Sequence, residues 1–396
     1  MGNKLIVLAL ILCVFGNTTG EFVIAGILPA IANDFEVSIS SAGLLVTAYA
    51  IGMIIGGPVL TAFTVHFSRK PLIVALLTIS VLGNLLSAIA PNYAVLFAAR
   101  IFTSLVTSSF FANAIVIAAS TAPQGKEAST VSKLAFGMNL SMILGAPIGT
   151  LIGTHFGWRS TFIAIAVCVV IGLLLVIQLV PRDRNSSSAA SVWTELRVFR
   201  NHDVQLAIAI TAIGNAGLLA VFTYFSPLLT NVSGFSADTV AILLLVYGVG
   251  ATIGNFIGGW LSDRALMPSQ IILLALLAAT LVLLWFYSSN MPVTAILVFI
   301  IGALGFSVIP GMQTRVLTTA ASAPTLAIAV NASAYQLAAA FAAWYGGMLI
   351  SNNGFGFRSI YIIGAGVTLA GIILSSYAWS RDRKAIRSVH SRNANS

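Results

Sequence analysis

The chain has 396 residues, of which 58% are hydrophobic and 7% charged, and its mean hydropathy is +1.00. A soluble domain carries about 25% charged residues, so this composition excludes a cytosolic enzyme, a secreted protein and a disordered chain. A bilayer-spanning helix needs about 20 mostly apolar residues, and twelve such helices would use roughly 60% of the chain. We therefore expect an all-α membrane protein with twelve transmembrane helices in the lipid bilayer and only short loops.

The net charge of +9 does not indicate a nucleic-acid partner. The Lys and Arg residues stand in short clusters between apolar segments, which is the pattern that the positive-inside rule produces. The two cysteines, Cys13 and Cys168, lie within apolar runs. There a buried small hydrophobic residue is a simpler interpretation than a disulfide or a metal ligand.

The N-terminal segment allows two interpretations. Lys4 followed by the apolar run 5–15 is also typical of a signal peptide. Apolar character resumes at Phe22 and continues to Ile31, so we favour a first span that crosses the bilayer. The predicted spans are, in chain order, 5–31, 41–64, 71–90, 93–118, 129–153, 159–180, 205–229, 239–262, 270–288, 293–316, 325–350 and 358–380.

The longest polar stretch divides these spans into two sets of six. We predict an N-terminal bundle over 1–180, a cytoplasmic linker over 181–204, and a C-terminal bundle with a short basic tail over 205–396. With the N-terminus inside, every Lys and Arg except Arg100, Arg159 and Arg358 falls on the cytoplasmic side. This asymmetry predicts that both termini are cytoplasmic.

The two sets of spans carry an internal repeat. The segment GWRS at 157–160 recurs as GFRS at 356–359, and Pro123 recurs as Pro324. The set Tyr49, Gly52 and Gly56 recurs at an offset of 198 as Tyr247, Gly250 and Gly254. Nearly equal offsets along the chain predict two similar six-helix halves, a transporter design in which the substrate site lies between the repeats near the midplane.

Of the ten carboxylates, only Glu21 lies inside a predicted span. A charge at the bilayer centre costs roughly 2.5–3.5 kcal/mol on insertion scales, so an intramembrane carboxylate is a functional candidate. Burial disfavours the ionised form, so Glu21 can load and release a proton; the alternative is a structural salt bridge or a protonated packing residue. Arg100 lies deep in a span at a depth similar to that of Glu21. It either stabilises the ionised carboxylate or pairs with helix carbonyls.

Other polar residues within the spans are candidates for a substrate cavity. They lie in the first, fourth, seventh and eleventh spans and are Asn17, Thr18, Thr103, Thr107, Asn215, Tyr224, Asn331, Tyr335 and Gln336. The alternative is that they form hydrogen bonds between helices, as polar residues in membranes often do. In the fifth span, Gly145 and Gly149 have the four-residue spacing that lets helices approach closely. Pro147 between them adds a kink, so this segment is predicted to seal or hinge the cavity.

The chain resembles the major facilitator superfamily, and within it the twelve-spanner drug:proton antiporters, including arabinose-efflux-type and chloramphenicol-resistance transporters. The resemblance rests on Glu21-Phe22 followed by Leu28-Pro29, on Arg100 in LFAARIFTSL, on the glycines around Pro147, and on a loop motif with Gly259, Asp263 and Arg264. The equivalent loop of the first half keeps Arg69 and Lys70 but has Val65 and Ser68 where the family has Asp and Gly. The resemblance therefore implies gating that depends more on Asp263-Arg264.

Together these features favour a secondary transporter, not an enzyme, in a bacterial cytoplasmic membrane. It would export a small organic compound, such as a drug, sugar or nucleoside, in exchange for protons by alternating access. A proton-coupled importer, a passive facilitator and a non-transporting sensor are the alternatives. No Walker motif occurs and the four histidines are scattered, so we expect no ATP hydrolysis, no cofactor and no metal site. We expect a monomer.

Overall fold

A computed structural model describes residues 2–64, 67–123, 127–181, 200–320, 324–351 and 356–394. The described residues are helical apart from short turns, and they contain no strand. The helices are α1 Gly2–Phe22, α2 Ile24–Asp34, α3 Ile39–Thr64, α4 Arg69–Ala88, α5 Tyr93–Ser120, α6 Glu127–Leu140, η1 Ser141–Gly145, α7 Ala146–Phe156, α8 Trp158–Leu179, α10 His202–Thr223, α11 Phe225–Pro227, η3 Leu228–Val232, α12 Ala237–Tyr287, α13 Met291–Thr319, α14 Pro324–Ser351 and α15 Ser359–Ala394. Val65 and most of the predicted linker, 182–199, lie outside the described residues.

These helices account for the twelve predicted spans and confirm the fold class. The first span consists of α1 and α2, the fifth of α6, η1 and α7, and the seventh of α10, α11 and η3. Ten described helices are long and apolar enough to cross a membrane. One of them, α12, has 51 residues. At about 1.5 Å per residue it is long enough to cross the hydrocarbon core twice.

Two boundaries differ from the prediction. The ninth span begins before its predicted start at 270, because the non-helical residue that separates it from the eighth span within α12 is Ala265, where φ is −156° and ψ is 80°. A proline fits the first turn of a helix because its missing N–H has no partner there, so the ninth span begins before Pro268. The last helix continues to Ala394, well past the predicted end at 380. No Pro or Gly follows Gly371, so nothing in the tail interrupts the helix.

Two of the breaks within the spans lie close to prolines. The π-helical turn η1 directly precedes Pro147. Proline has no N–H to donate and its ring crowds the preceding turn, so the helix widens there. The seventh span is interrupted at Tyr224, where φ is −101° and ψ is 24°, three residues before Pro227. The first span is divided at Val23, which keeps helical dihedral angles and lies well before Pro29, so no proline explains that division.

The glycines of the internal repeat make equivalent contacts in the two halves. A Cβ on Gly56 of α3 would lie 2.1 Å from the Leu105 carbonyl oxygen of α5. A Cβ on Gly254 of α12 would lie 1.8 Å from the Ala303 carbonyl oxygen of α13. In both halves the second and fourth helices thus pack backbone against backbone, which larger residues would prevent.

The GWRS and GFRS segments lie at equivalent positions in the two halves, at the start of the sixth helix of each half. Gly157 and Gly356 both have positive φ, at 85° and 65°, a conformation that favours glycine. Arg159 donates to the Ala90 carbonyl oxygen at 3.1 Å, and Arg358 donates to the Phe286 carbonyl oxygen at 3.0 Å. Each arginine therefore ties the sixth helix of its half to the end of the third.

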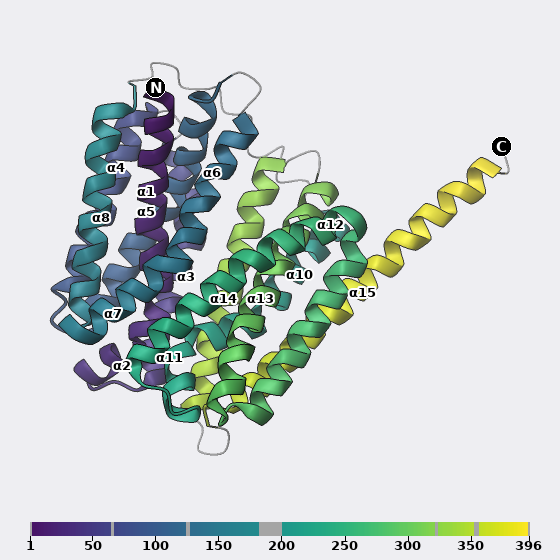
Figure 1. The fold of residues 1–396 in the computed structure, drawn as a ribbon. Coiled ribbons are helices and arrows are strands. Elements are labelled where there is room, and N and C mark those ends of the chain that lie inside the picture. The colour runs from purple at the N-terminus through teal and green to yellow at the C-terminus, as the bar shows by residue number, and fades with distance from the viewer. Residues whose placement is uncertain are drawn as a thin grey trace.

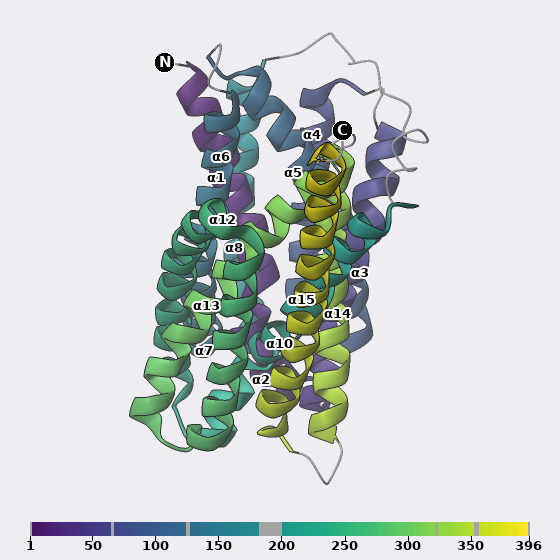
Figure 2. The ribbon, with the colours of Figure 1, turned by 90° about the vertical axis from the view of Figure 1, so that its right-hand side faces the viewer.

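The two halves lie side by side, with both chain termini at the same end of the molecule (Figures 1 and 2). We call this end the terminal side and the opposite end the far side. Contacts between the halves lie from the middle to the far side. Thr47 of α3 donates to the Ala340 carbonyl oxygen of α14 at 3.1 Å, and His155 lies 3.4 Å from Asp238. Towards the terminal side the two bundles diverge (Figure 1).

Tyr224 closes the far side between the halves. Its hydroxyl donates to the Ala343 carbonyl oxygen of α14 at 2.6 Å. Its ring fills the space left by glycines, because a Cβ on Gly43 of α3 would lie 2.2 Å from the hydroxyl and one on Gly346 would lie 2.7 Å from the ring. The phenol is fully buried, so this contact seals the interface beyond the middle of the molecule.

Candidate functional site

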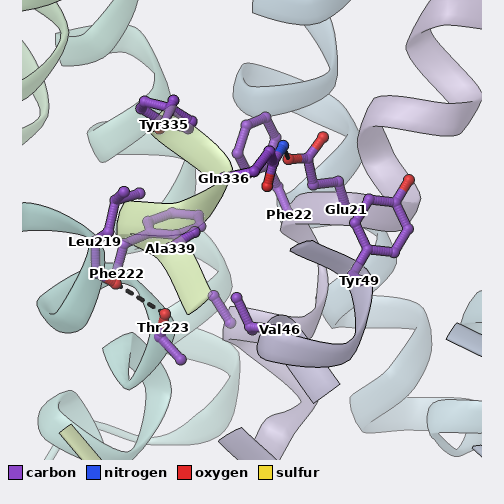
Figure 3. Close-up of a pocket in the computed structure, with 11 residues that line it drawn as sticks. Glu21, Phe22, Val46, Tyr49, Leu219, Phe222, Thr223, Tyr335, Gln336 and Ala339 are labelled. Atoms are coloured by element: carbon purple, nitrogen blue, oxygen red, sulfur yellow. Dashed lines mark hydrogen bonds between the residues drawn. The ribbon is translucent and has the colours of Figure 1, made fainter. Parts of the chain in front are cut away.

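A cavity lies between the two halves, midway along the helices, and residues of both halves line it (Figure 3). The space, including the part open to solvent, is about 450 Å³. Its lining is mostly apolar and aromatic, with a single carboxylate: Glu21, Phe22, Ala25, Val46, Tyr49, Leu219, Phe222, Thr223, Tyr335, Gln336 and Ala339. An enclosed apolar wall with a few polar groups is typical of sites for small organic ligands.

Glu21 is the one acidic residue of α1 and lies at the end of that helix. It provides the charge of this cavity. Gln336 of α14 donates through Nε2 to Glu21 Oε1 at 2.8 Å. Figure 3 shows the carboxylate turned towards this amide and away from the Tyr49 ring. The hydrogen bond joins α1 of the N-terminal half to α14 of the C-terminal half, so the intramembrane carboxylate also connects the two bundles.

Arg100 is buried close to this cavity, with 1% of its surface exposed. Its Cζ lies 4.3 Å from the centroid of the Tyr49 ring and 5.8 Å from that of Phe162. Within the described residues no carboxylate oxygen lies within 4.0 Å of the guanidinium, and Nε and Nη1 have no acceptor. The two predicted coupling residues therefore share Tyr49 as a neighbour without forming an ion pair in this structure.

Two of the nine predicted cavity residues, Tyr335 and Gln336, line the cavity. In the N-terminal half, Asn17 accepts a hydrogen bond from Ser80 of α4 at 2.6 Å. Thr107 accepts from the Tyr49 hydroxyl at 3.3 Å. These side chains therefore connect neighbouring helices of one bundle.

The remaining predicted cavity residues also contact their own half or the far side. Thr103 faces Gly83 of α4, where a Cβ would lie 2.1 Å from the Thr103 hydroxyl. Thr18 is buried, and its hydroxyl has no hydrogen-bond partner among the described residues. In the C-terminal half, Asn331 accepts from Thr211 at 2.6 Å, and Asn215 donates to the Thr211 carbonyl oxygen at 2.7 Å. Tyr224 lies in the far-side contact.

The glycines around Pro147 pack within the N-terminal half. A Cβ on Gly145 would lie 2.0 Å from the Thr19 hydroxyl, and one on Gly149 would lie 2.6 Å from Val23 Cγ2. Contacts four residues apart on both helices show that the fifth span lies directly against the first. Since Glu21 lies between these two contact points in the chain, this packing fixes the helix that presents the carboxylate. Pro147 itself is buried at the start of α7.

The loop motif of the second half has few contacts in this structure. Asp263 is exposed and forms no ion pair with the described residues. The Arg264 guanidinium lies 3.7 Å from the centroid of the Trp260 ring. A Cβ on Gly259 would meet no atom within 4 Å, whereas one on Gly258 would lie 1.9 Å from the Ser307 carbonyl oxygen. Gly258 is therefore the glycine of this segment that requires close helix packing.

The corresponding segment of the first half is anchored within its own bundle. Arg69 donates through Nη1 to Asn113 Oδ1 of α5 at 3.1 Å. Lys70 is half-buried beside it. An amide of the fourth span thus provides an acceptor for Arg69.

Several residues that line the cavity were not among those predicted from the sequence. Tyr49 was noted in the sequence only as a member of the repeat, and Phe22, Phe222 and Thr223 were not proposed as lining residues. The rings pack against each other across the halves, with 5.7 Å between the centroids of Phe22 and Phe222. For these aromatic lining residues, the one signal in the sequence is that Phe22 directly follows Glu21.

An all-helical membrane protein of two six-helix repeats, with a site between them at the middle of the helices, has the architecture of a secondary transporter. The family model described as "Major Facilitator Superfamily" matches residues 10–343. The chain belongs to this superfamily, whose members are membrane transporters and not enzymes.

Individual relatives agree with this assignment. The chain is 37% identical over 367 residues to the "Inner membrane transport protein YdhP" of Escherichia coli K12, covering 93% of each protein. It is 32% identical over 347 residues to the "Chloramphenicol resistance protein" of Streptomyces lividans, covering 86% of this chain and 87% of that one. A solved structure of a D-xylose–proton symporter shares the fold, with a TM-score of 0.73, 19% identity, and coverage of 94% and 96%. The chain is thus a multi-pass membrane protein with relatives among bacterial inner-membrane transporters.

Proposed function

We propose that this protein exports a small organic compound from the bacterial cytoplasm in exchange for protons, with Glu21 as the proton site. The observation that carries the proposal is the hydrogen bond from Gln336 to Glu21 at the cavity between the halves. Coupling requires a group whose proton occupancy differs between two conformations. A carboxylate bound to the opposite half meets this requirement, because its surroundings change when the halves move.

The terminal side is assigned to the cytoplasm. It carries most of the basic residues, including Arg69, Lys70 and Arg264, whereas the described far-side arginines are Arg159 and Arg358. The positive-inside rule then orients both termini inwards. Since the halves contact each other from the middle to the far side, we assign this structure to a conformation closed to the outside, with bundles 1–180 and 205–396 as its moving parts.

The cavity favours a neutral or singly cationic compound with an apolar body. One carboxylate and one amide stand among aromatic and aliphatic walls, so a polyanion would meet repulsion and no charge partner. Proton and substrate would then occupy Glu21 by turns: protonation from the outside releases the compound, and loss of the proton to the cytoplasm restores its binding. The similarity to a protein named for chloramphenicol resistance supports the outward direction.

Replacing Glu21 by Gln tests the proposal, because glutamine has nearly the same volume and cannot titrate. Growth-inhibition profiles of a deletion and an overexpressing strain identify a substrate, with chloramphenicol among the compounds. In inverted vesicles the Glu21→Gln variant is expected to insert normally but to lose substrate-driven proton flux and accumulation against a gradient. Glu21→Asp is expected to retain part of both.

The matched control is Glu36→Gln, which neutralises an exposed carboxylate near the far end of the same span. This control is expected to transport like the unmodified protein. Concentrative, pH-dependent export by Glu21→Gln would place the coupling site elsewhere.

A further inference from the structure

Tyr49 of α3 contacts Arg100 and shares the lining of the cavity with Glu21. It lines the cavity together with Glu21, and the Arg100 guanidinium lies against its ring, 4.3 Å from the centroid. The guanidinium is almost completely buried, yet its Nε and Nη1 have no acceptor in the described part of the chain. A buried arginine next to a carboxylate would ordinarily pair with it, but no Glu21–Arg100 pair within 4.0 Å is present.

We propose that Tyr49 is a positioning residue for the proton site: its ring holds Arg100 beyond ion-pairing distance of Glu21, so that Glu21 remains able to exchange its proton. This inference rests on the proposed function, in which Glu21 is the coupling group. It assigns Tyr49 a part in coupling that does not require contact with the substrate.

The physical reason is the strength of a buried arginine–carboxylate pair. An arginine directly beside a carboxyl group lowers its pKa by about one to three units. A directly paired Glu21 would therefore be much harder to protonate during the cycle. The face of the Tyr49 ring gives the guanidinium a cation–π contact, which offsets part of its burial without involving the carboxylate.

The other polar residues that line the cavity near Glu21 are neutral and cannot form an ion pair with it. The Gln336 amide donates a hydrogen bond but is neutral, and Tyr335 contributes an uncharged phenol from the same helix. Among the described residues that line the cavity or contact its Tyr49, Arg100 is the one with a full positive charge. The Tyr49 hydroxyl donates to Thr107 at 3.3 Å, which orients the ring between α3 and α5.

Infrared difference spectroscopy of the purified protein in lipid nanodiscs tests the inference without a known substrate. The carbonyl band of a protonated carboxylic acid is followed against pH, and its loss in Glu21→Gln assigns the band to Glu21. In Tyr49→Leu, Arg100 is free to approach, and the pH at which the band is half-maximal is expected to fall by about one unit or more. Tyr49→Phe keeps the ring, and its half-maximal pH is expected to match that of the unmodified protein.

A second set of variants separates positioning from a general structural effect. Adding Arg100→Met to Tyr49→Leu is expected to reverse the shift, because the approaching charge is removed. Tyr49→Met replaces the Leu variant if the latter is poorly folded. An unshifted half-maximal pH in the Leu or Met variant, an equal shift in Tyr49→Phe, or a shift that persists without Arg100 overturns this inference but leaves Glu21 as the proton site. Absence of any band that depends on Glu21 overturns the proton site itself.

Discussion

Arg159 and Asp34 show how the far side of the N-terminal half is held together by individual residues. Arg159 donates to Asp34 Oδ2, and Trp158 donates to the same oxygen at 3.2 Å. The Arg159 guanidinium holds the pKa of the Asp34 carboxyl below its ordinary value, despite slight desolvation. Since both side chains are about 40% exposed, the pair contributes about 1 kcal/mol or less.

Asp34→Asn is expected to lower the melting temperature in detergent slightly at neutral pH. Because the pKa of Asp34 is depressed in the folded protein, the stabilisation is present above the unfolded value of about 3.9 and is lost as the pH falls through the folded value. The difference in melting temperature between the variant and the unmodified protein should therefore be constant from pH 8 to about 5 and shrink in more acidic buffer. Glu36→Gln, which removes a neighbouring exposed carboxylate, should show no such pH-dependent difference.

At the scale of helices, the close approach of α12 to α13 depends on Gly254, which has no side chain. A Cβ on Gly254 would lie 1.8 Å from the Ala303 carbonyl oxygen and 2.7 Å from its Cα. The obstructing atoms belong to the backbone, so a rotamer change cannot relieve the overlap.

Gly254→Ala is expected to destabilise the protein by about 1–3 kcal/mol, seen as a lower melting temperature and a lower level in the membrane. Gly366→Ala is the matched control, because a Cβ on this helical glycine would meet no atom within 4 Å. Equal melting temperatures for the two variants would contradict the close approach of α12 and α13.

The two terminal-side loops are expected to differ in their importance for transport. Asp263 is exposed and has no ion-pair partner among the described residues while the halves diverge on this side. We expect it to find a basic residue or a helix N-terminus when this side closes. Arg69 already has an acceptor in Asn113 of its own half.

Asp263→Asn should therefore reduce transport several-fold while leaving insertion and stability unchanged. Arg69→Ala should have the smaller effect in the same vesicle assay. A larger loss for Arg69→Ala would reverse this ranking of the two halves.

The sequence predicted the helices better than it predicted the cavity. The length of the apolar runs and the recurrence of Tyr49 and its glycines at Tyr247 were sufficient for twelve spans in two halves. The cavity wall was harder, because a span in a bilayer is apolar on the faces towards lipid, neighbouring helices and cavity alike. Polar residues such as Asn17 bond to the next helix, whereas Phe222 and Tyr49 line the cavity. Only the arrangement of helices distinguishes these positions.

At the scale of the whole molecule, the distribution of Lys and Arg predicts the orientation in the membrane. Reporter fusions at 66–70, 183–200 and the C-terminus should read cytoplasmic, and fusions at 34–38, 155–158 and 352–356 should read external. The reason is the concentration of Lys and Arg at the first set of sites. A consistent reversal would invert the assignment of the terminal side and with it the direction in which this conformation opens.

If Glu21 is the proton site, as proposed, the single carboxylate lining the cavity sets a thermodynamic limit on the transport cycle. With one proton exchanged for one neutral molecule, each turn moves one charge across the membrane, which is worth about 2.3 kcal/mol at 100 mV. That energy sustains a concentration ratio of roughly fortyfold, since about 1.4 kcal/mol corresponds to a factor of ten. Exchange for a monovalent cation would be electroneutral and would draw on the pH difference alone. Under the proposed exchange, export of cationic compounds would therefore fail before export of neutral ones when the external medium becomes alkaline.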